Sequence, residues 1–184
     1  MLLQSKEVIF AITNCIYRFE NILVQMEEMI KQGAIITPIL SFNAWKNPDI
    51  IKYKEEIENL TKNKILSEEK EINKVENDIM IIAPCSGNTI GKLAGGIQDT
   101  PVLNAAKANL KRENNIVLGI STNDGLSSSA ENIGKLLNRR KYYFVPFRQD
   151  NPITKPNSLR MEDRYILTTL QEALDGKQIQ PLLL

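Results

Sequence analysis

The residues best suited to bind a ligand lie in one short polar segment near the middle of the sequence. An apolar run from Ile79 to Ala83 precedes it and predicts a strand buried on both faces, as in a parallel sheet. Apolar residues from Ile90 to Ile97 then recur at helical spacing. A strand, a turn and a helix start make a crevice where open α/β sheets bind ligands, and the helix N-terminus favours an anion. The segment consists of Pro84, Cys85, Ser86, Gly87, Asn88 and Thr89.

This segment offers hydroxyl groups, an amide and backbone N–H groups to a flat polar ligand. Its small side chains would also let the backbone come close to such a ligand. In the alternative interpretation it is an ordinary turn between a strand and a helix, in which Ser86 only caps the helix. The residues by themselves leave both interpretations open.

Polar residues also follow three other predicted strands. The apolar runs Val8 to Ile12, Ala34 to Leu40 and Ile116 to Ile120 each end in hydroxyl or amide side chains. Because the carboxyl ends of parallel strands meet at one edge of a sheet, we expect these side chains to lie near the central turn. In the alternative, those after the first two strands only cap helices. The candidates are Thr13, Asn14, Ser41, Ser121, Thr122, Asn123 and Asp124.

Strands and helices alternate along the whole chain, and Tyr142 to Val145 adds a fifth predicted strand. This alternation predicts an α/β fold with a three-layer, flavodoxin-like (Rossmann-like) parallel sheet. We expect the strand order 2-1-3-4-5, with helices on both faces of the sheet. A length of 184 residues suits one domain that covers residues 1–184.

Two segments depart from the simple alternation. Residues 42–77 carry mixed charges on predicted solvated helices, with Trp45 in a small satellite core or, alternatively, as a surface anchor or lid. Pro146 to Ser158 predicts a long loop over the crevice or against a neighbouring subunit or, alternatively, a surface loop in which Ser158 only caps the last helix. That helix is predicted from Leu159 to Asp175. Helix starts are indicated at Asn47-Pro48, at Thr100-Pro101, and by a capping box of Ser128 and Glu131.

The composition excludes several classes of function. The formal net charge of +1 gives no sign of a nucleic-acid partner, and Cys15 and Cys85 match neither a disulfide framework nor a metal site. There is no histidine, which removes the commonest general base and most zinc and haem sites. No apolar stretch approaches a membrane span, and residues 1–7 lack the pattern of a secretion signal, so we expect a reducing cytoplasm.

The central segment resembles the signature of the flavoprotein superfamily that includes the homo-oligomeric flavin-containing cysteine decarboxylases. The resemblance rests on Pro84 to Thr89 and on the spacing of the residues that follow. It implies that the turn closes around the flavin ring of FMN, with the Asn88 amide at the ring edge. It also implies that the turns after Ile12, Leu40 and Ile120 contribute to the same FMN site. The residues with matching spacing are Lys92, Ala94, Gly96, Asp99 and Leu103.

Further segments resemble a narrower family, the B subunits of bacterial dipicolinate synthases. This resemblance covers nearly the whole chain and is weakest between Phe42 and Asn77. It implies a homo-oligomeric, FMN-binding-type subunit that acts with an A subunit, on which NAD(P) is expected. Together they would form pyridine-2,6-dicarboxylate from a reduced pyridine precursor in the mother cell of a spore-forming bacterium. The segments are residues 83–89, 100–110, 120–124, 144–147, 149–150, 155–159, 176–178 and 180–181, together with Pro152.

The dicarboxylate substrate that this resemblance implies needs cationic or N–H donors. Lys92, Lys155 and Asn157 are the predicted substrate-binding residues, while Arg148 fits a solvated surface charge better. No catalytic residue and no metal ligand is assigned.

Two departures from the superfamily pattern bear on function. Residues 13–16 lack the glycine and serine usual in related proteins, which leaves the backbone less free to wrap a phosphate. The lack of histidine disfavours a flavin-dependent decarboxylase, which uses histidine as its base. A non-catalytic scaffold without flavin stays open as the alternative.

Overall fold

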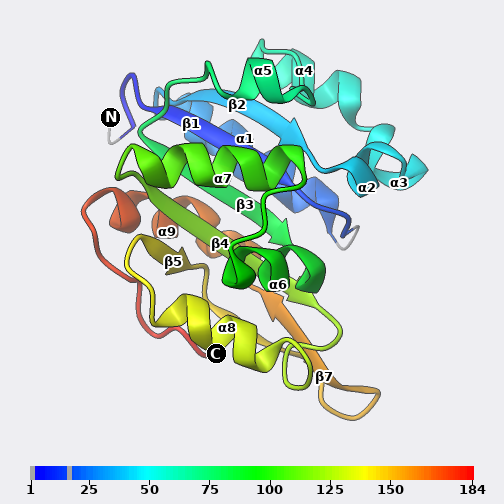
Figure 1. Cartoon of the computed structure of the whole chain (residues 1–184). Helices are drawn as coiled ribbons and strands as arrows, with labels where there is room; N and C mark the ends of the chain where they lie inside the picture. Colours follow the sequence, from blue (N-terminus) through cyan, green and yellow to red (C-terminus); the bar gives the residue numbers. More distant parts are fainter. Residues whose placement is uncertain (1–2, 16–17) are drawn as a thin grey trace.

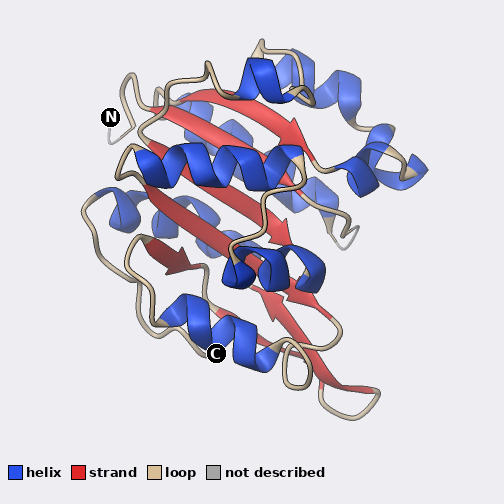
Figure 2. Cartoon of the chain, in the orientation of Figure 1, coloured by secondary structure: helices blue, strands red, loops and turns tan. Residues whose placement is uncertain are grey.

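The strands of this computed structural model form one sheet with helices on both of its faces (Figures 1 and 2). The structure describes residues 3–15 and 18–184, so positions 16 and 17 of the predicted exit from the first strand lie outside it. Within that part the sheet has seven strands: six follow the order β2-β1-β3-β4-β7-β6, and the seventh, β5, pairs with β4. Their bounds are β1 (Glu7–Ile12), β2 (Ile35–Leu40), β3 (Ile79–Cys85), β4 (Asn115–Thr122), β5 (Tyr142–Phe144), β6 (Phe147–Asn151) and β7 (Lys155–Met161).

The first five strands are parallel and confirm the predicted order 2-1-3-4-5. β3 lies in the middle and is buried at every position, as its continuous apolar run predicts. β1 pairs with it from Val8 to Ala11, and β4 pairs with its other side. The carboxyl ends of these strands therefore meet at one edge of the sheet, where the polar turns follow.

Two apolar cores, one on each face of the sheet, make the three layers (Figure 2). One core includes buried residues of α1 (Phe19–Lys31), α4 (Lys54–Thr61) and α9 (Ile166–Leu174). The other includes α5 (Glu69–Ile72), α6 (Gly87–Gly95), α7 (Pro101–Lys111) and α8 (Ala130–Leu137). No helix in the described part of the chain is long and apolar enough to cross a membrane.

The prediction of a long loop from Pro146 to Ser158 is wrong. β6 and β7 form an antiparallel hairpin, and β7 pairs antiparallel with the end of β4, so the sheet is mixed (Figure 1). Asn151 and Pro152 lie at its turn, where the Asn151 side chain accepts hydrogen bonds from the backbone N–H groups of Ile153 and Thr154, both at 3.0 Å. Pro156 and Asn157 lie within β7.

The last helix is also displaced from its prediction. Because residues 159–161 belong to β7, α9 begins at Ile166 after a short 3-10 turn, Asp163–Tyr165, and ends at Leu174. Ser158 therefore does not cap a helix. Its hydroxyl donates to the backbone oxygen of Thr122, 3.2 Å away, and ties β7 to the end of β4.

The proline-marked helix starts are confirmed. The Asn47 side chain accepts from the backbone N–H of Asp49 at α3 (Pro48–Ile51), and Thr100 accepts from the N–H of Leu103 at α7. The capping box of Ser128 and Glu131 is wrong, since α8 begins at Ala130.

Between β2 and β3, the charged segment forms four short helices. Trp45, at the end of α2 (Phe42–Trp45), is partly buried and packs against the large core that contains α1, so it belongs to that core and not to a separate small one. In this way the segment covers one edge of the sheet and brings α2 next to the carboxyl end of β2.

Candidate functional site

The central turn connects β3 directly to α6. Ser86 has extended backbone angles (φ −75°, ψ 157°), and α6 begins at the next residue, Gly87. The Ser86 side chain makes no capping hydrogen bond to the helix backbone, and its hydroxyl oxygen lies 3.1 Å from that of Thr89. These two hydroxyl groups, on adjacent turns of the chain, present polar atoms beside the N-terminus of α6.

The turn after β1 is bonded to the central turn through Thr13. The buried Thr13 hydroxyl donates to the backbone oxygen of Pro84 at 2.8 Å and accepts from the N–H of Ser86 at 2.9 Å. Thr13 thus holds the shape of the central turn and has little polar capacity left for a ligand. Further along, the Cys15 sulfur lies 2.8 Å from the Ser121 hydroxyl, so this turn also reaches the end of β4.

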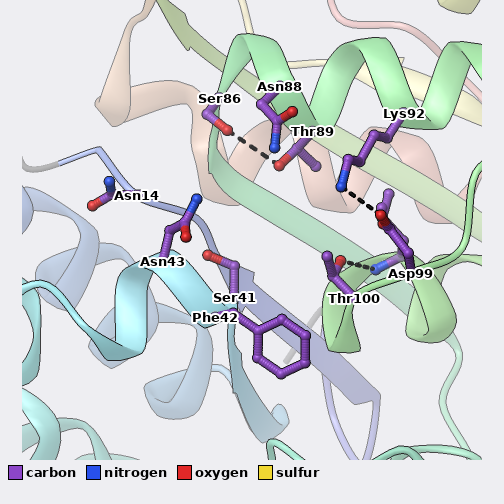
Figure 3. A pocket seen from close by; sticks show the side chains of 11 residues that line it. Asn14, Ser41, Phe42, Asn43, Ser86, Asn88, Thr89, Lys92, Asp99 and Thr100 are labelled. Atoms are coloured by element: carbon purple, nitrogen blue, oxygen red, sulfur yellow. Dashed lines mark hydrogen bonds and ion pairs between the residues drawn. The ribbon is translucent and has the colours of Figure 1, made fainter.

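A cavity of about 380 Å³ opens between these turns and the helices that follow them (Figure 3). Its walls come from the ends of β1 and β2, from the first turns of α6, and from the connection between α6 and α7. Six predicted site residues line it, namely Asn14, Ser41, Ser86, Asn88, Thr89 and Lys92. Five residues that were not assigned to a site from the sequence complete it: Phe42, Asn43, Asp99, Thr100 and Leu103.

The described lining of the cavity is polar and carries no net charge. Among the residues that the structure describes, its ionisable side chains are Lys92 and Asp99, whose nitrogen and oxygen lie 2.7 Å apart in an ion pair. Its neutral polar groups include the amides of Asn14, Asn43 and Asn88, which both donate and accept hydrogen bonds. In Figure 3, Asn14, Ser41 and Asn43 lie on one side of the cavity, opposite the residues of α6. Such a lining suits a flat ligand with alternating donors and acceptors.

Gly87 does not line the cavity but faces the turn after β4. A β-carbon there would lie 2.5 Å from the Thr122 hydroxyl oxygen and 2.8 Å from a carboxylate oxygen of Asp124. The missing side chain therefore lets the N-terminus of α6 pack directly on this turn. Pro84 and Cys85, the residues before it, are buried in the sheet.

The turn after β4 is a closed hydrogen-bonded unit centred on Asp124. Its carboxylate accepts hydrogen bonds from the hydroxyl groups of Ser128 at 2.6 Å, Thr122, and Ser129 at 2.9 Å. The hydrogen bonds from Ser128 and Thr122 lower the pKa of Asp124, which is therefore ionised at neutral pH. Ser121, Thr122, Asn123 and Asp124 were predicted to bind the cofactor, but none of them lines the cavity. Thr122 and Asp124 pack against the start of α6 at Gly87, Ser121 contacts Cys15, and the Asn123 side chain accepts from Ser158 at 3.4 Å.

Lys155 and Asn157 lie on the β6–β7 hairpin, near the edge of the sheet opposite β2 (Figure 1). Lys155 forms an exposed ion pair with Asp150 at 3.3 Å, and Arg160 holds the same carboxylate at 3.0 Å. Neither Lys155 nor Asn157 lines the cavity of its own chain. Only a neighbouring copy or another subunit could bring them to a cavity of this kind.

Cys85 is expected to be unreactive in the folded protein. Burial raises the pKa of its thiol, so the nucleophilic thiolate is absent at neutral pH. Iodoacetamide at neutral pH should therefore modify the partly exposed Cys15 before Cys85, as peptide mass spectrometry would report. Cys85→Ala should retain ligand binding by the cavity. Rapid native-state labelling of Cys85 would contradict this assignment.

Comparison with known proteins gives a consistent result. The sequence matches the family model described as Flavoprotein over residues 3–160. It is 35% identical over 189 aligned positions to the B subunit of dipicolinate synthase from Bacillus subtilis (strain 168), and the match covers 98% of this chain and 94% of that protein. The crystal structure of the dipicolinate synthase B subunit from Bacillus halodurans C is also 35% identical, with a TM-score of 0.92, over 100% of this chain and 98% of that one.

A more distant solved structure shares the fold. It is a dodecameric FMN-dependent UbiX-like decarboxylase from Escherichia coli O157:H7, with a TM-score of 0.60 and 19% identity. The match covers 71% of this chain and 75% of that one. At this identity the similarity establishes the common fold alone.

Proposed function

Because the chain belongs to the flavoprotein family, we propose that its cavity binds FMN and that residues 1–184 act as one flavoprotein domain. The observation that carries this proposal is the cavity itself. It joins the turns after β1, β2 and β3 at the carboxyl edge of the sheet, and six residues selected from the sequence for ligand binding line it. Its volume of about 380 Å³ lies within the usual range for small-molecule sites.

The residues present fit a flavin mononucleotide by their chemistry. The Asn88 amide can donate to and accept from the edge of the flavin ring, and the Ser86 and Thr89 hydroxyl groups lie beside it. Asn14, Ser41 and Asn43 on the opposite side offer neutral donors to the ribityl chain and phosphate. When bound, FMN would supply the capacity to accept a hydride. The chain's own part is to orient the ring and to limit its exposure to water.

The two similar proteins with 35% identity are B subunits of dipicolinate synthases. We propose that the chain is the B subunit of a dipicolinate synthase and works in the mother-cell cytoplasm during sporulation. With an NAD(P)-binding A subunit it would form pyridine-2,6-dicarboxylate from a dihydro- or tetrahydropyridine dicarboxylate, as an oxidoreductase. Assembly into a homo-oligomer is part of the same proposal, since a relative with this fold is dodecameric.

A second candidate is a scaffold subunit that holds no flavin and stabilises its partner. One observation favours it: among the described residues, the ionisable groups that line the cavity are paired with each other, so none of them is a free base that faces a substrate. The two candidates differ in whether the purified protein contains flavin.

Co-expression with the A subunit tests the proposed function. The assembled enzyme should form dipicolinate from the reduced precursor and should show the flavin absorption bands near ~370 and ~450 nm. Dipicolinate formation by a colourless complex would favour the scaffold. If the A subunit without this chain forms dipicolinate at the full rate of the assembled enzyme, a catalytic or binding role for this chain is contradicted.

Lys155 provides a more local prediction about the assembled enzyme. Its exposed ammonium group, paired with Asp150, is proposed to bind a substrate carboxylate in the cavity of a neighbouring subunit. Lys155→Ala should then raise the substrate KM roughly tenfold, the scale of one charge-assisted hydrogen bond, with kcat and flavin content unchanged. Lys70→Ala, at an exposed position on α5, is the matched control. Unaltered kinetics and assembly for Lys155→Ala would leave the hairpin as a plain surface element.

A further inference from the structure

The ion pair at the cavity joins two groups of unequal accessibility. Lys92 lies on the second turn of α6 with 25% of its side chain exposed, whereas the Asp99 side chain is 53% exposed. Their charged atoms are 2.7 Å apart, and both residues line the cavity (Figure 3). The cation is thus built into the site, and the anion lies at its solvent-facing side.

Asp99 belongs to the connection between α6 and α7. Every residue from Gly95 to Asp99 is exposed, and Gly96 ends α6 in the left-handed region (φ +71°). Thr100 then starts α7 by accepting from the N–H of Leu103. Because this connection covers no core, its carboxylate can leave Lys92 without breaking buried contacts.

Exchange of the carboxylate on Lys92 is favoured by the surroundings of the cation. Exposed ion pairs contribute little to stability, because water screens both charges. A ligand carboxylate that enters the cavity excludes water from the ammonium group and makes a stronger charge-assisted hydrogen bond. Asp99 then competes with the ligand for one cation.

We infer that Lys92 binds a carboxylate group of the second ligand of the cavity, and that Asp99 is its resting partner, displaced when this ligand binds. This inference rests on the proposed binding of FMN, beside which the carboxylate would lie. In the free protein Asp99 keeps Lys92 paired, and it lowers the affinity for every anion that binds there, the dicarboxylate included.

The test is a calorimetric titration of the FMN-loaded chain with pyridine-2,6-dicarboxylate and with its uncharged analogue pyridine-2,6-dicarboxamide. Wild type should bind the dicarboxylate at least tenfold more tightly than the dicarboxamide, as one charge-assisted contact provides. Lys92→Gln should abolish this difference, and Lys92→Arg should retain most of it. Asp99→Asn should bind the dicarboxylate roughly three- to tenfold more tightly than wild type, because the competitor is removed.

A matched control comes from α8. Lys135 and Glu131 form an exposed ion pair with the same 2.7 Å separation, but neither lines the cavity, so Lys135→Gln should leave both titrations unchanged. Circular dichroism shows whether each variant is folded. If Lys92→Gln does not fold, Lys92→Arg and Asp99→Asn still decide the question. Equal affinities of wild type or Lys92→Arg for the two ligands would overturn the inference, and so would an Asp99→Asn variant with the same dicarboxylate affinity as wild type.

Titration of the flavin-free chain separates this inference from the proposed function. FMN and riboflavin should bind Lys92→Gln as they bind wild type. A loss of FMN affinity without a loss of riboflavin affinity would assign Lys92 to the cofactor phosphate and overturn the inference. Failure of wild type to bind FMN would instead refute the proposed function, and the dicarboxylate titration of the same flavin-free chain would then decide whether Lys92 binds carboxylates.

Discussion

Gly87→Ala is expected to lower the free energy of unfolding by about 1–3 kcal/mol, the usual cost of an overpacked site. The added β-carbon would lie 2.5 Å from the Thr122 hydroxyl oxygen, 2.8 Å from Asp124 and 3.0 Å from the Ser129 hydroxyl oxygen. These three side chains are hydrogen-bonded together, so none can move without breaking the turn after β4. For a protein of this size the melting temperature should fall by roughly 2–12 °C.

The same substitution should weaken FMN binding, because α6 carries Asn88 and Thr89 into the cavity and would be pushed from its place. Gly91→Ala on the same helix is the matched control. Its β-carbon would meet only the Asn132 amide nitrogen, at an ordinary 3.5 Å, and alanine is a better helix former than glycine by about 0.5–1 kcal/mol. Thermal unfolding of both variants checks the prediction, and a Gly87→Ala protein as stable as Gly91→Ala would contradict the described packing.

Asn88→Asp is expected to weaken FMN binding by roughly 1–3 kcal/mol, the cost of an unpaired polar contact. The aspartate replaces the amide donor with a second acceptor and places a negative charge against acceptors of the flavin ring. This corresponds to a roughly five- to 150-fold higher dissociation constant, at about 1.4 kcal/mol per factor of ten.

The melting temperature of Asn88→Asp distinguishes a lost contact with FMN from a general loss of folding stability. Asn88 lies in the first turn of α6 and is exposed, and a negative charge there favours the helix. The variant should therefore unfold at the same or a higher temperature than wild type while it binds FMN less tightly. Equal FMN affinity in a fluorescence titration would show that Asn88 does not contact the flavin ring.

The parallel part of the fold could be predicted because its signals are local. β1, β3 and β4 are continuous apolar runs, and each is buried on both faces as such runs require. The starts of α3 and α7 could be predicted for the same reason, from a capping residue followed by proline. Proline favours the first position of a helix because its φ angle is fixed and because the N–H that it lacks would have no partner there.

The β6–β7 hairpin could not be predicted, because its pairing with β4 is a long-range contact. Asn151 and the nearby prolines indicate a turn, but most of β6 and the first three residues of β7 are exposed and show no apolar pattern of a strand. Their formation depends on Thr122 and Ser121, which lie far earlier in the chain and pair with Leu159 and Arg160. The capping box failed for a local reason, since the Ser128 hydroxyl donates to Asp124, four residues earlier, instead of to the helix.

The residues of the candidate site also fall into two groups, those that local sequence signals reveal and those that only long-range contacts place. Residues that directly follow β1, β2 and β3 could be selected from the sequence, because the fold brings strand ends together. Phe42, Asn43 and Asp99 could not, because they reach the cavity only through the placement of α2 opposite the start of α7. Thr122 and Asp124 carry the same polar signal as Ser86 and Asn88, but their hydrogen bonds are used within their own turn.

Equilibrium dialysis of the purified chain against FMN tests the central claim most directly. The chain should retain close to one FMN per molecule at saturation, and the Asn88→Asp variant should require a higher concentration to reach the same occupancy. A wild-type chain that retains no FMN at concentrations up to about 1 mM, where even weak specific sites fill, would contradict the assignment of the cavity as a flavin site.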